Sequence, residues 1–153
     1  MVGGDASFFN SNVKDENGQT LGSSNGIRIY PNIGYFFLTK FVAGINGNFN
    51  YGKPSGGSSN TGFGGGPFVR YYFLKHEQRV NVLVEANYNY FISKTQGFDS
   101  ANGSSYRFKA GPVIYFNSSV GLELTLNYGS SKFNRNTSND FNIAFGFQIH
   151  LEK

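Results

Sequence analysis

Residues 141–151 read FNIAFGFQIHL, and a large apolar side chain stands at every odd position, whereas the even positions carry small or polar residues. Side chains of a β-strand point alternately to its two faces. A helix would scatter both sets around its axis, so this stretch predicts a strand with one apolar face and one small or polar face. The apolar set comprises Phe141, Ile143, Phe145, Phe147, Ile149 and Leu151.

Seven further segments alternate in the same way, the first of them most weakly: residues 2–8, 27–37, 41–51, 62–73, 80–92, 106–116 and 120–129. An even number of antiparallel strands lets the first and last pair with each other, which removes the exposed edges of an open sheet. The sequence therefore predicts an all-β fold, an eight-stranded antiparallel up-and-down barrel that takes up residues 1–153 as a single domain.

The composition excludes several classes of protein. Charged residues make up 14% of the chain and aromatic residues 18%, and there is no cysteine, which rules out disulfides, thiolate metal sites and a cysteine nucleophile. The net charge of +4 comes from scattered Lys and Arg rather than a basic stripe, so no nucleic acid is expected as a partner. No apolar run reaches the ~18 residues of a transmembrane helix. The N-terminus lacks the regions of a signal peptide, and we expect a mature chain that begins with an added methionine.

The volume of the apolar side chains decides which face points inward. An eight-stranded barrel has an interior just wide enough for side chains to fill it, and the many Phe and Tyr of the apolar face do not fit there. The other face carries glycines such as Gly44, Gly64, Gly66 and Gly111, which suit a narrow lumen. We therefore expect a transmembrane barrel with lipids as its partner, and a soluble lipocalin-like carrier is disfavoured.

The predicted inner face also carries charges of both signs, which can pair inside a lumen. We expect a lumen charge network of Asp5, Arg28, Arg70, Glu85, Arg107, Lys109 and Glu123. Arg107 is the preferred partner of Glu123, with Arg70 and Lys109 as alternatives. Inward-facing aromatic residues near the short turns are expected to plug the bore: Tyr30, Phe36, Phe68, Tyr72 and Tyr115. A packed lumen favours a structural or surface-interaction role, and the alternative is a channel or transporter for small solutes or hydrophobic compounds.

Aromatic residues gather near the strand ends, which is typical of the girdles at the two membrane interfaces. The girdle by the short turns is expected to contain Tyr35, Phe37, Tyr71, Phe73 and Phe116. The girdle toward the longer connections is expected to contain Tyr51, Tyr88, Tyr90, Tyr106 and Tyr128.

The connections alternate in predicted length. Residues 11–25, 52–60, 96–105 and 130–139 read as long polar loops, and residues 39–40, 74–79 and 117–119 as short turns. Long loops on one rim and short turns on the other are typical of outer-membrane barrels. Three strands carry proline a few residues before aromatics, at Pro31, Pro67 and Pro112, which predicts bulges or register breaks at a shared height.

With these features, the chain resembles the small eight-stranded outer-membrane β-barrels, in plan similar to the OmpA transmembrane domain, OmpX and OmpW. Gly146, Ile149 and Leu151 match the family's C-terminal assembly signal, although Ala144 replaces its polar residue and Glu152-Lys153 follow it. The abundance of Asn, Tyr and Phe resembles barrels of Bacteroidetes-type bacteria. The resemblance implies a monomer in the bacterial outer membrane, with extracellular loops, periplasmic termini, the barrel assembly machinery as a partner and an unidentified extracellular ligand.

The candidate catalytic groups are sparse. His76 is predicted in an exposed turn and His150 in the lumen, and two separated histidines supply neither a metal site nor a nucleophilic triad. Barrel hydrolases of this size class carry a His and a Ser on the lipid face, and no lipid-facing His is predicted here. We therefore expect no catalytic residues, no metal and no cofactor.

Overall fold

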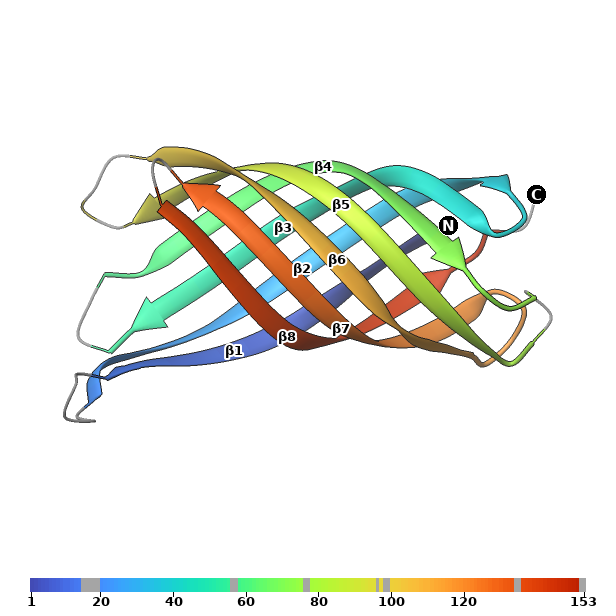
Figure 1. Cartoon of the computed structure of the whole chain (residues 1–153), viewed down its shortest axis with the longest axis horizontal. Helices are drawn as coiled ribbons and strands as arrows, with labels where there is room; N and C mark the ends of the chain where they lie inside the picture. The colour runs from blue at the N-terminus through green and yellow to red at the C-terminus, as the bar shows by residue number, and fades with distance from the viewer. Residues whose placement is uncertain are drawn as a thin grey trace.

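In the computed structural model the chain folds into a closed barrel in which each strand pairs with its sequence neighbours and β1 pairs with β8 (Figure 1). All pairings are antiparallel. The strands are β1 (Val2–Lys14), β2 (Thr20–Leu38), β3 (Phe41–Pro54), β4 (Asn60–Tyr72), β5 (Val80–Thr95), β6 (Ala101–Tyr115), β7 (Val120–Phe133) and β8 (Asn136–Ile149). The predicted fold class is confirmed. Both termini lie at one end of the barrel, which we call the terminal end, and we call the other the distal end.

The structure describes residues 1–14, 20–55, 58–75, 78–95, 97, 100–133 and 136–151, and for residues 9–14, 20–24, 95, 133 and 136 the backbone alone. His76, Glu152 and Lys153 lie outside the described residues. Within the described ranges, no helix is long and apolar enough to cross a membrane.

All four predicted long loops are wrong in extent, because strands continue into each of them; in the predicted loop 52–60, β3 runs to Pro54 and β4 begins at Asn60. β1 and β2 continue into the predicted loop 11–25, β6 begins at Ala101, and β7 and β8 leave only residues 134–135 between them. The Ser and Asn residues of these segments lack apolar alternation, so they resemble loops in sequence, yet pairing in a hairpin satisfies their backbone groups equally well. Residues 39–40, 74–79 and 117–119 do connect strands, as predicted.

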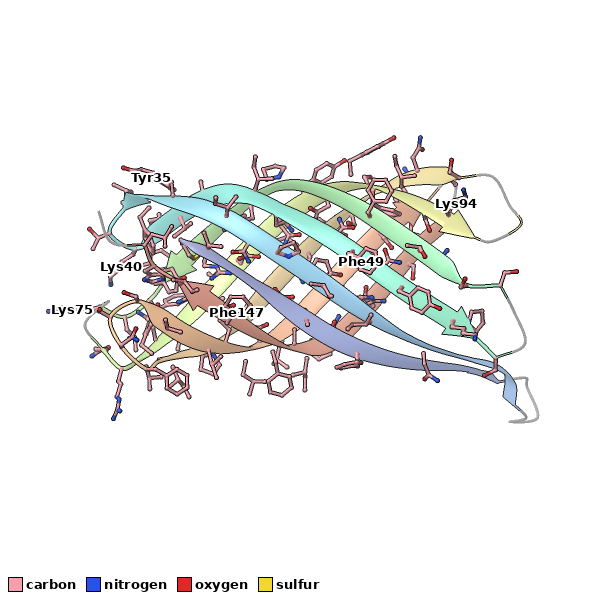
Figure 2. The ribbon with its side chains drawn as sticks, turned by 180° about the vertical axis from the view of Figure 1, so that it is seen from behind. Tyr35, Lys40, Phe49, Lys75, Lys94 and Phe147 are labelled. Carbon is pink, nitrogen blue, oxygen red and sulfur yellow. The ribbon has the colours of Figure 1, made fainter. Side chains whose placement is uncertain are left out.

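The apolar face of the barrel points outward, as the volume argument requires. Phe49 and Phe147, labelled in Figure 2, are 42% and 50% exposed. Large apolar side chains stay exposed along the strands, among them Ile45, Phe63, Leu126, Phe141 and Phe145. A surface of this kind is stable against lipid, because in water so large an apolar area would drive association.

The prolines interrupt hydrogen bonding without shifting the register. Beside Pro67 the β4–β5 ladder skips from Gly65↔Tyr90 to Phe68↔Asn87, and the pairing resumes in the same register. The ladders beside Pro31 and Pro112 also skip and resume unshifted. The predicted register breaks are therefore wrong, because a missing N–H removes a hydrogen bond but leaves the flanking pairs in place.

The glycines that precede two of these prolines allow the close approach of the strands. A Cβ atom at Gly66 would overlap the carbonyl oxygen of Tyr88, and one at Gly111 would overlap that of Leu124. Glycine is the residue that fits where another backbone passes this closely.

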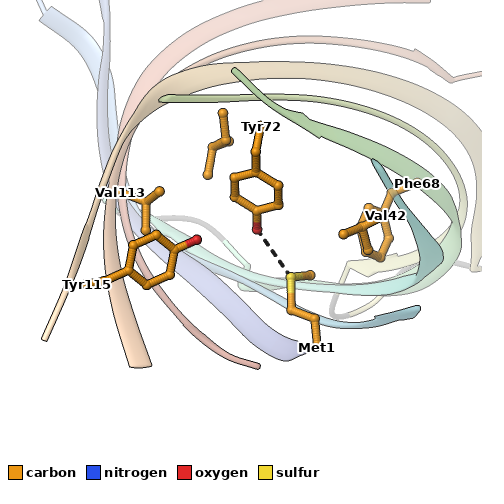
Figure 3. Packing of buried hydrophobic residues seen from close by; sticks show 7 residues of the cluster. Met1, Val42, Phe68, Tyr72, Val113 and Tyr115 are labelled. Carbon is orange, nitrogen blue, oxygen red and sulfur yellow. Dashed lines mark hydrogen bonds between the residues drawn. The ribbon is translucent and has the colours of Figure 1, made fainter. Parts of the chain in front are cut away.

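The lumen near the terminal end is packed with apolar and aromatic side chains (Figure 3). Val42, Leu83 and Val113 are fully buried there, and the half-buried Phe36 packs against the cluster. The whole cluster comprises Met1, Val42, Phe68, Tyr72, Leu83, Val113 and Tyr115, and we call it the aromatic plug. It fills the bore at the end where the short turns lie.

Candidate functional site

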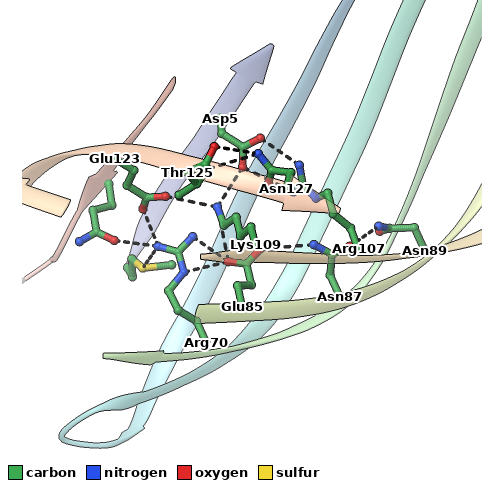
Figure 4. Close-up of polar contacts among 12 residues, drawn as sticks. Asp5, Arg70, Glu85, Asn87, Asn89, Arg107, Lys109, Glu123, Thr125 and Asn127 are labelled. Atoms are coloured by element: carbon green, nitrogen blue, oxygen red, sulfur yellow. Dashed lines mark hydrogen bonds and ion pairs between the residues drawn. The ribbon is translucent and has the colours of Figure 1, made fainter. Parts of the chain in front are cut away.

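A buried network of charges lies in the lumen next to the aromatic plug (Figure 4). Arg70 of β4 lies at its centre, and its side chain has no solvent exposure. Its Nε donates to Oε2 of Glu85 at 2.8 Å, and its Nη1 donates to Oε1 of Glu123 at 2.6 Å. Arg70 thereby joins β4 to β5 and, across the lumen, to β7.

Lys109 of β6 forms the second centre of the network. Its Nζ lies 2.9 Å from Oδ2 of Asp5, 3.2 Å from Oε2 of Glu123 and 3.7 Å from Oε2 of Glu85. The same Asp5 accepts a hydrogen bond from Nη1 of Arg107 at 3.0 Å. Every strand that carries a charged member of the network is therefore linked to at least one other through the lumen.

The network is electrically balanced. Three cations, Arg70, Arg107 and Lys109, face three carboxylates, Asp5, Glu85 and Glu123, and all six residues are buried. Buried ions lose their hydration, and attraction compensates for this only when partners and hydrogen bonds are close to ideal. We call these six residues the lumen ion network.

Arg28 is the one residue of the expected charge network that lies elsewhere. Its Nη1 donates to Oδ2 of Asp140 at 2.6 Å, and both side chains are only partly buried. Alternation in sequence assigns a side chain to the inner face, but it does not show the height at which that side chain lies along the bore. The preferred pairing of Glu123 with Arg107 is also wrong, because Arg107 reaches Asp5 while Arg70 and Lys109 reach Glu123.

Three neutral residues complete the network, and sequence reasoning did not place them in it. The Tyr72 hydroxyl donates to Oε1 of Gln148, which also accepts from Nη1 of Arg70 at 2.7 Å. Gln148 in turn donates from Nε2 to the Tyr115 hydroxyl at 2.6 Å. Gln148 occupies one of the alternate positions of the last strand that face inward, and this was the available signal for it. Only the closed barrel brings β8 opposite β4.

The interior aromatics occupy two regions. Phe68, Tyr72 and Tyr115 belong to the aromatic plug. Tyr30, expected among them, instead lies toward the distal end, where its ring centroid is 3.6 Å from the guanidinium carbon of Arg107. A guanidinium over an aromatic face is a favourable contact, and Tyr30 pairs with Asp5 in the β1–β2 ladder, so Arg107 contacts two neighbouring side chains of β1 and β2.

The expected girdle residues lie on the outer surface. Nine are exposed: Tyr35, Phe37, Phe73 and Phe116 at the terminal end, and Tyr51, Tyr88, Tyr90, Tyr106 and Tyr128 toward the distal end. Tyr71 is half-buried because its ring packs between Phe41 and Phe73, with centroids 4.6 and 5.0 Å away. Whether these rings sit at the lipid interfaces stays a prediction.

His150 lies inside the terminal mouth of the barrel. Its ring contacts Phe36, Tyr72 and Tyr115 edge-on, with centroids 5.0 to 6.1 Å apart. Among the residues that the structure describes, no three His, Cys, Asp or Glu residues are grouped so that they could hold a metal ion. The expected assembly-signal residues occupy the end of the chain, with Gly146 and Ile149 in β8 and Leu151 exposed just beyond it.

A double-mutant cycle should separate the partners of Glu123. We expect Glu123→Gln combined with Arg70→Met, or with Lys109→Met, to show a coupling energy above about 1 kcal/mol, because these groups are in direct contact. Combination with Arg107→Met should give less than about 0.5 kcal/mol. Urea titration in lipid bilayers provides the free energies of unfolding. Equal coupling to all three cations would contradict this geometry.

No protein-family model and no curated protein sequence matches the chain. Solved structures do match. The neisserial surface protein A, NspA, is 14% identical with a TM-score of 0.72, and the match covers 97% of this chain and 94% of that one. The outer-membrane enzyme PagL is 10% identical with a TM-score of 0.54, and the match covers 98% and 99% of the two chains. Both are small eight-stranded outer-membrane β-barrels. With its closed barrel, exposed apolar wall and polar lumen, this chain has the fold of the small eight-stranded outer-membrane β-barrels.

Proposed function

We propose that the protein is a monomeric, non-enzymatic protein of the bacterial outer membrane that acts through the connections at its distal end and does not conduct solutes. The observation that carries this proposal is the lumen closed in its terminal half. The aromatic plug closes the terminal half, and the neutral lumen ion network spans the bore beside it. A conducting pore needs a continuous water-filled path, and 16- to 18-stranded porins, roughly twice this size, provide one.

The connections at the distal end are the natural contact surface for an extracellular ligand. In outer-membrane barrels the longer, polar hairpin ends face outward, and the polar segments 11–25, 52–60, 96–105 and 130–139, which the strands partly extend into, all lie at the distal end of this chain. Both termini of this chain lie at the end of the short turns, so we assign that end to the periplasm. We further propose that Gly146, Ile149 and Leu151 serve recognition by the barrel assembly machinery.

Conductance in planar bilayers tests the closed lumen. We expect the wild-type protein to show no ohmic current steps, because charged and aromatic side chains fill the bore. The variant Phe68→Ala/Tyr72→Ala, which removes two rings of the aromatic plug, should conduct more. Stable current steps from the wild-type protein would instead support the small-solute channel or transporter.

Epitope insertion tests the orientation. A short epitope placed after Ser55, between β3 and β4, should be labelled by antibody on intact cells. The same epitope between Thr39 and Lys40, in the β2–β3 turn, should be labelled only after the outer membrane is permeabilised. The reverse labelling would place the distal end in the periplasm and refute the proposed contact surface.

A further inference from the structure

The barrel is closed by a short ladder. β1 and β8 pair only from Val2↔Ile149 to Ala6↔Phe145, although β1 runs on to Lys14 and β8 begins at Asn136. Within the described residues, residues 7–14 and 136–144 have no partner across this junction, which we call the seam. Figure 1 shows β1 and β8 diverging along it toward the distal end.

Part of the seam lies among side chains of the apolar wall. Phe141 and Ile143 on β8 point outward, and Phe8 on β1 is 82% exposed. Backbone groups at membrane depth must be hydrogen-bonded, and unpaired backbone is tolerated only where it is buried in protein or lines a water-filled cavity. The seam therefore requires a polar space behind it.

Such a space lies in the distal half of the lumen. A cavity of about 180 Å³ is lined by residues that include Arg28 and Tyr30 on β2 and Asp140 on β8, the strands on either side of β1. Its volume is several times the ~10–15 Å³ that one ordered water requires. We call this cavity the distal chamber.

The distal chamber contains polar atoms that none of the described residues satisfies. Asn89 and Arg107 line it and are at least nine-tenths buried, yet Oδ1 of Asn89 and Nε of Arg107 have no hydrogen-bond partner among the residues that the structure describes. One is an acceptor and the other a donor, the pair that a hydroxyl group satisfies by donating and accepting. Arg28 and Arg107 are matched by Asp140 and Asp5, so the chamber is balanced in charge and suits an uncharged group.

The Arg28–Asp140 ion pair spans the seam on the lumen side. Arg28 lies opposite Ser7 in the β1–β2 ladder, at the first residue past the end of the β1–β8 pairing, and its partner Asp140 is on β8. The pair thus joins β2 to β8 across β1 where the ladder between β1 and β8 is missing. It is half-exposed, so its breakage costs little compared with that of a buried pair.

We propose that the seam is a lateral opening in the barrel wall, held by the Arg28–Asp140 pair, which admits the uncharged, hydroxyl-bearing head of a membrane amphipath into the distal chamber. The acyl chain of such a molecule stays between β1 and β8 in the surrounding lipid. This is a binding site in the half of the lumen that the aromatic plug leaves free, and it goes beyond the proposed role as a closed, surface-acting barrel.

The geometry of the seam can be tested with cysteine pairs, because the chain has no cysteine of its own. Ala6→Cys/Phe145→Cys lies in the paired register and should form a disulfide readily on oxidation. Phe8→Cys/Ile143→Cys would be the next pair on the same face if the ladder continued. Cysteines whose Cα atoms are more than about 7 Å apart cannot bridge, so we expect this pair to stay reduced. Equal oxidation of both pairs would show a closed wall and overturn the proposal.

The ligand can be tested with a single tryptophan, because the chain has none. Tyr30→Trp places the reporter in the distal chamber, and Phe68→Trp places a control in the aromatic plug. In phosphatidylcholine vesicles containing monoacylglycerol brominated near its head, we expect Tyr30→Trp fluorescence to be quenched well beyond that of Phe68→Trp. Joining Phe8→Cys to Ile143→Cys with a bifunctional thiol reagent should return the quenching to the Phe68→Trp level.

Variants of the Arg28–Asp140 pair, and a change of the brominated lipid, distinguish the remaining outcomes. Arg28→Gln and Asp140→Asn should each raise the quenching of Tyr30→Trp, and the heat-dependent gel shift of each variant confirms that it is folded. Brominated phosphatidylglycerol, whose head is anionic, should quench less than monoacylglycerol. Equal quenching by both lipids would refute an uncharged ligand. Quenching at the Phe68→Trp level in the wild type and in both folded variants would refute the opening, whereas the conductance result would be unaffected.

Discussion

Arg70→Met is expected to lower the free energy of unfolding by about 3–5 kcal/mol, because it leaves two buried carboxylates without their main cation. Among the described residues, the cation within 4 Å of Glu85 and Glu123 would then be Lys109, whose Nζ is 3.7 Å from the one and 3.2 Å from the other. Urea-induced unfolding in lipid bilayers, followed by far-UV circular dichroism and by the gel shift of unheated samples, measures the change.

Arg28→Met is the matched control for Arg70→Met. It removes the same side-chain type from the same face of the barrel, but from a pair whose side chains are 24% and 39% exposed. We expect a cost of about 0–1 kcal/mol, the range of exposed ion pairs. If the two variants were destabilised equally, solvent would have to reach Arg70, and the closed lumen on which the proposed function rests would be wrong.

Leu124→Arg is expected to lower the free energy of unfolding in bilayers by about 2–4 kcal/mol, which is the cost of a cation on the lipid face near the membrane midplane. Leu124 lies in the middle of the apolar stretch 120–128 of β7, is 45% exposed and points outward with Leu122 and Leu126. Urea titration in bilayers measures the loss, and the same variant in detergent micelles should lose less because micelles deform around the charge.

Thr125→Ser is the control for Leu124→Arg at the neighbouring position. Thr125 is buried in the lumen, and the change removes one methyl group at a cost of about 0.8 kcal/mol or less. Similar tolerance of both substitutions would mean that the apolar face does not contact lipid, and the membrane assignment would fail with it.

The lumen ion network and the seam suggest a division of the barrel along its axis. At the terminal end the network and the aromatic plug bind strands to one another through the bore. Toward the distal end the β1–β8 ladder is missing and the distal chamber is polar.

We expect amide hydrogens at Val2–Ala6 and Phe145–Ile149 to exchange more slowly than those of residues 136–144, because only the former are paired across the junction.

The alternation of residues by itself determined the strand number, the pairing order and the face that points outward. A period of two is a local property of the chain, and an interior too narrow for so many rings leaves one orientation of the barrel. Residues 141–151 therefore predicted β8 almost to its last residue, and the polar hairpin ends were missed because they have no apolar alternation. The alternate positions that face inward were also enough to predict the six charged residues that meet in the lumen.

Only the tertiary structure decided which of those charges pair and where the wall is incomplete. Parity places a residue on a face but says nothing of its height, which depends on strand tilt and register around the whole barrel. For that reason Arg28 lies with Asp140 in the distal half, and Glu123 lies with Arg70 from a strand three places away. The seam likewise depends on how the barrel closes, because the sequence of a strand does not determine over how many residues it pairs with its neighbour.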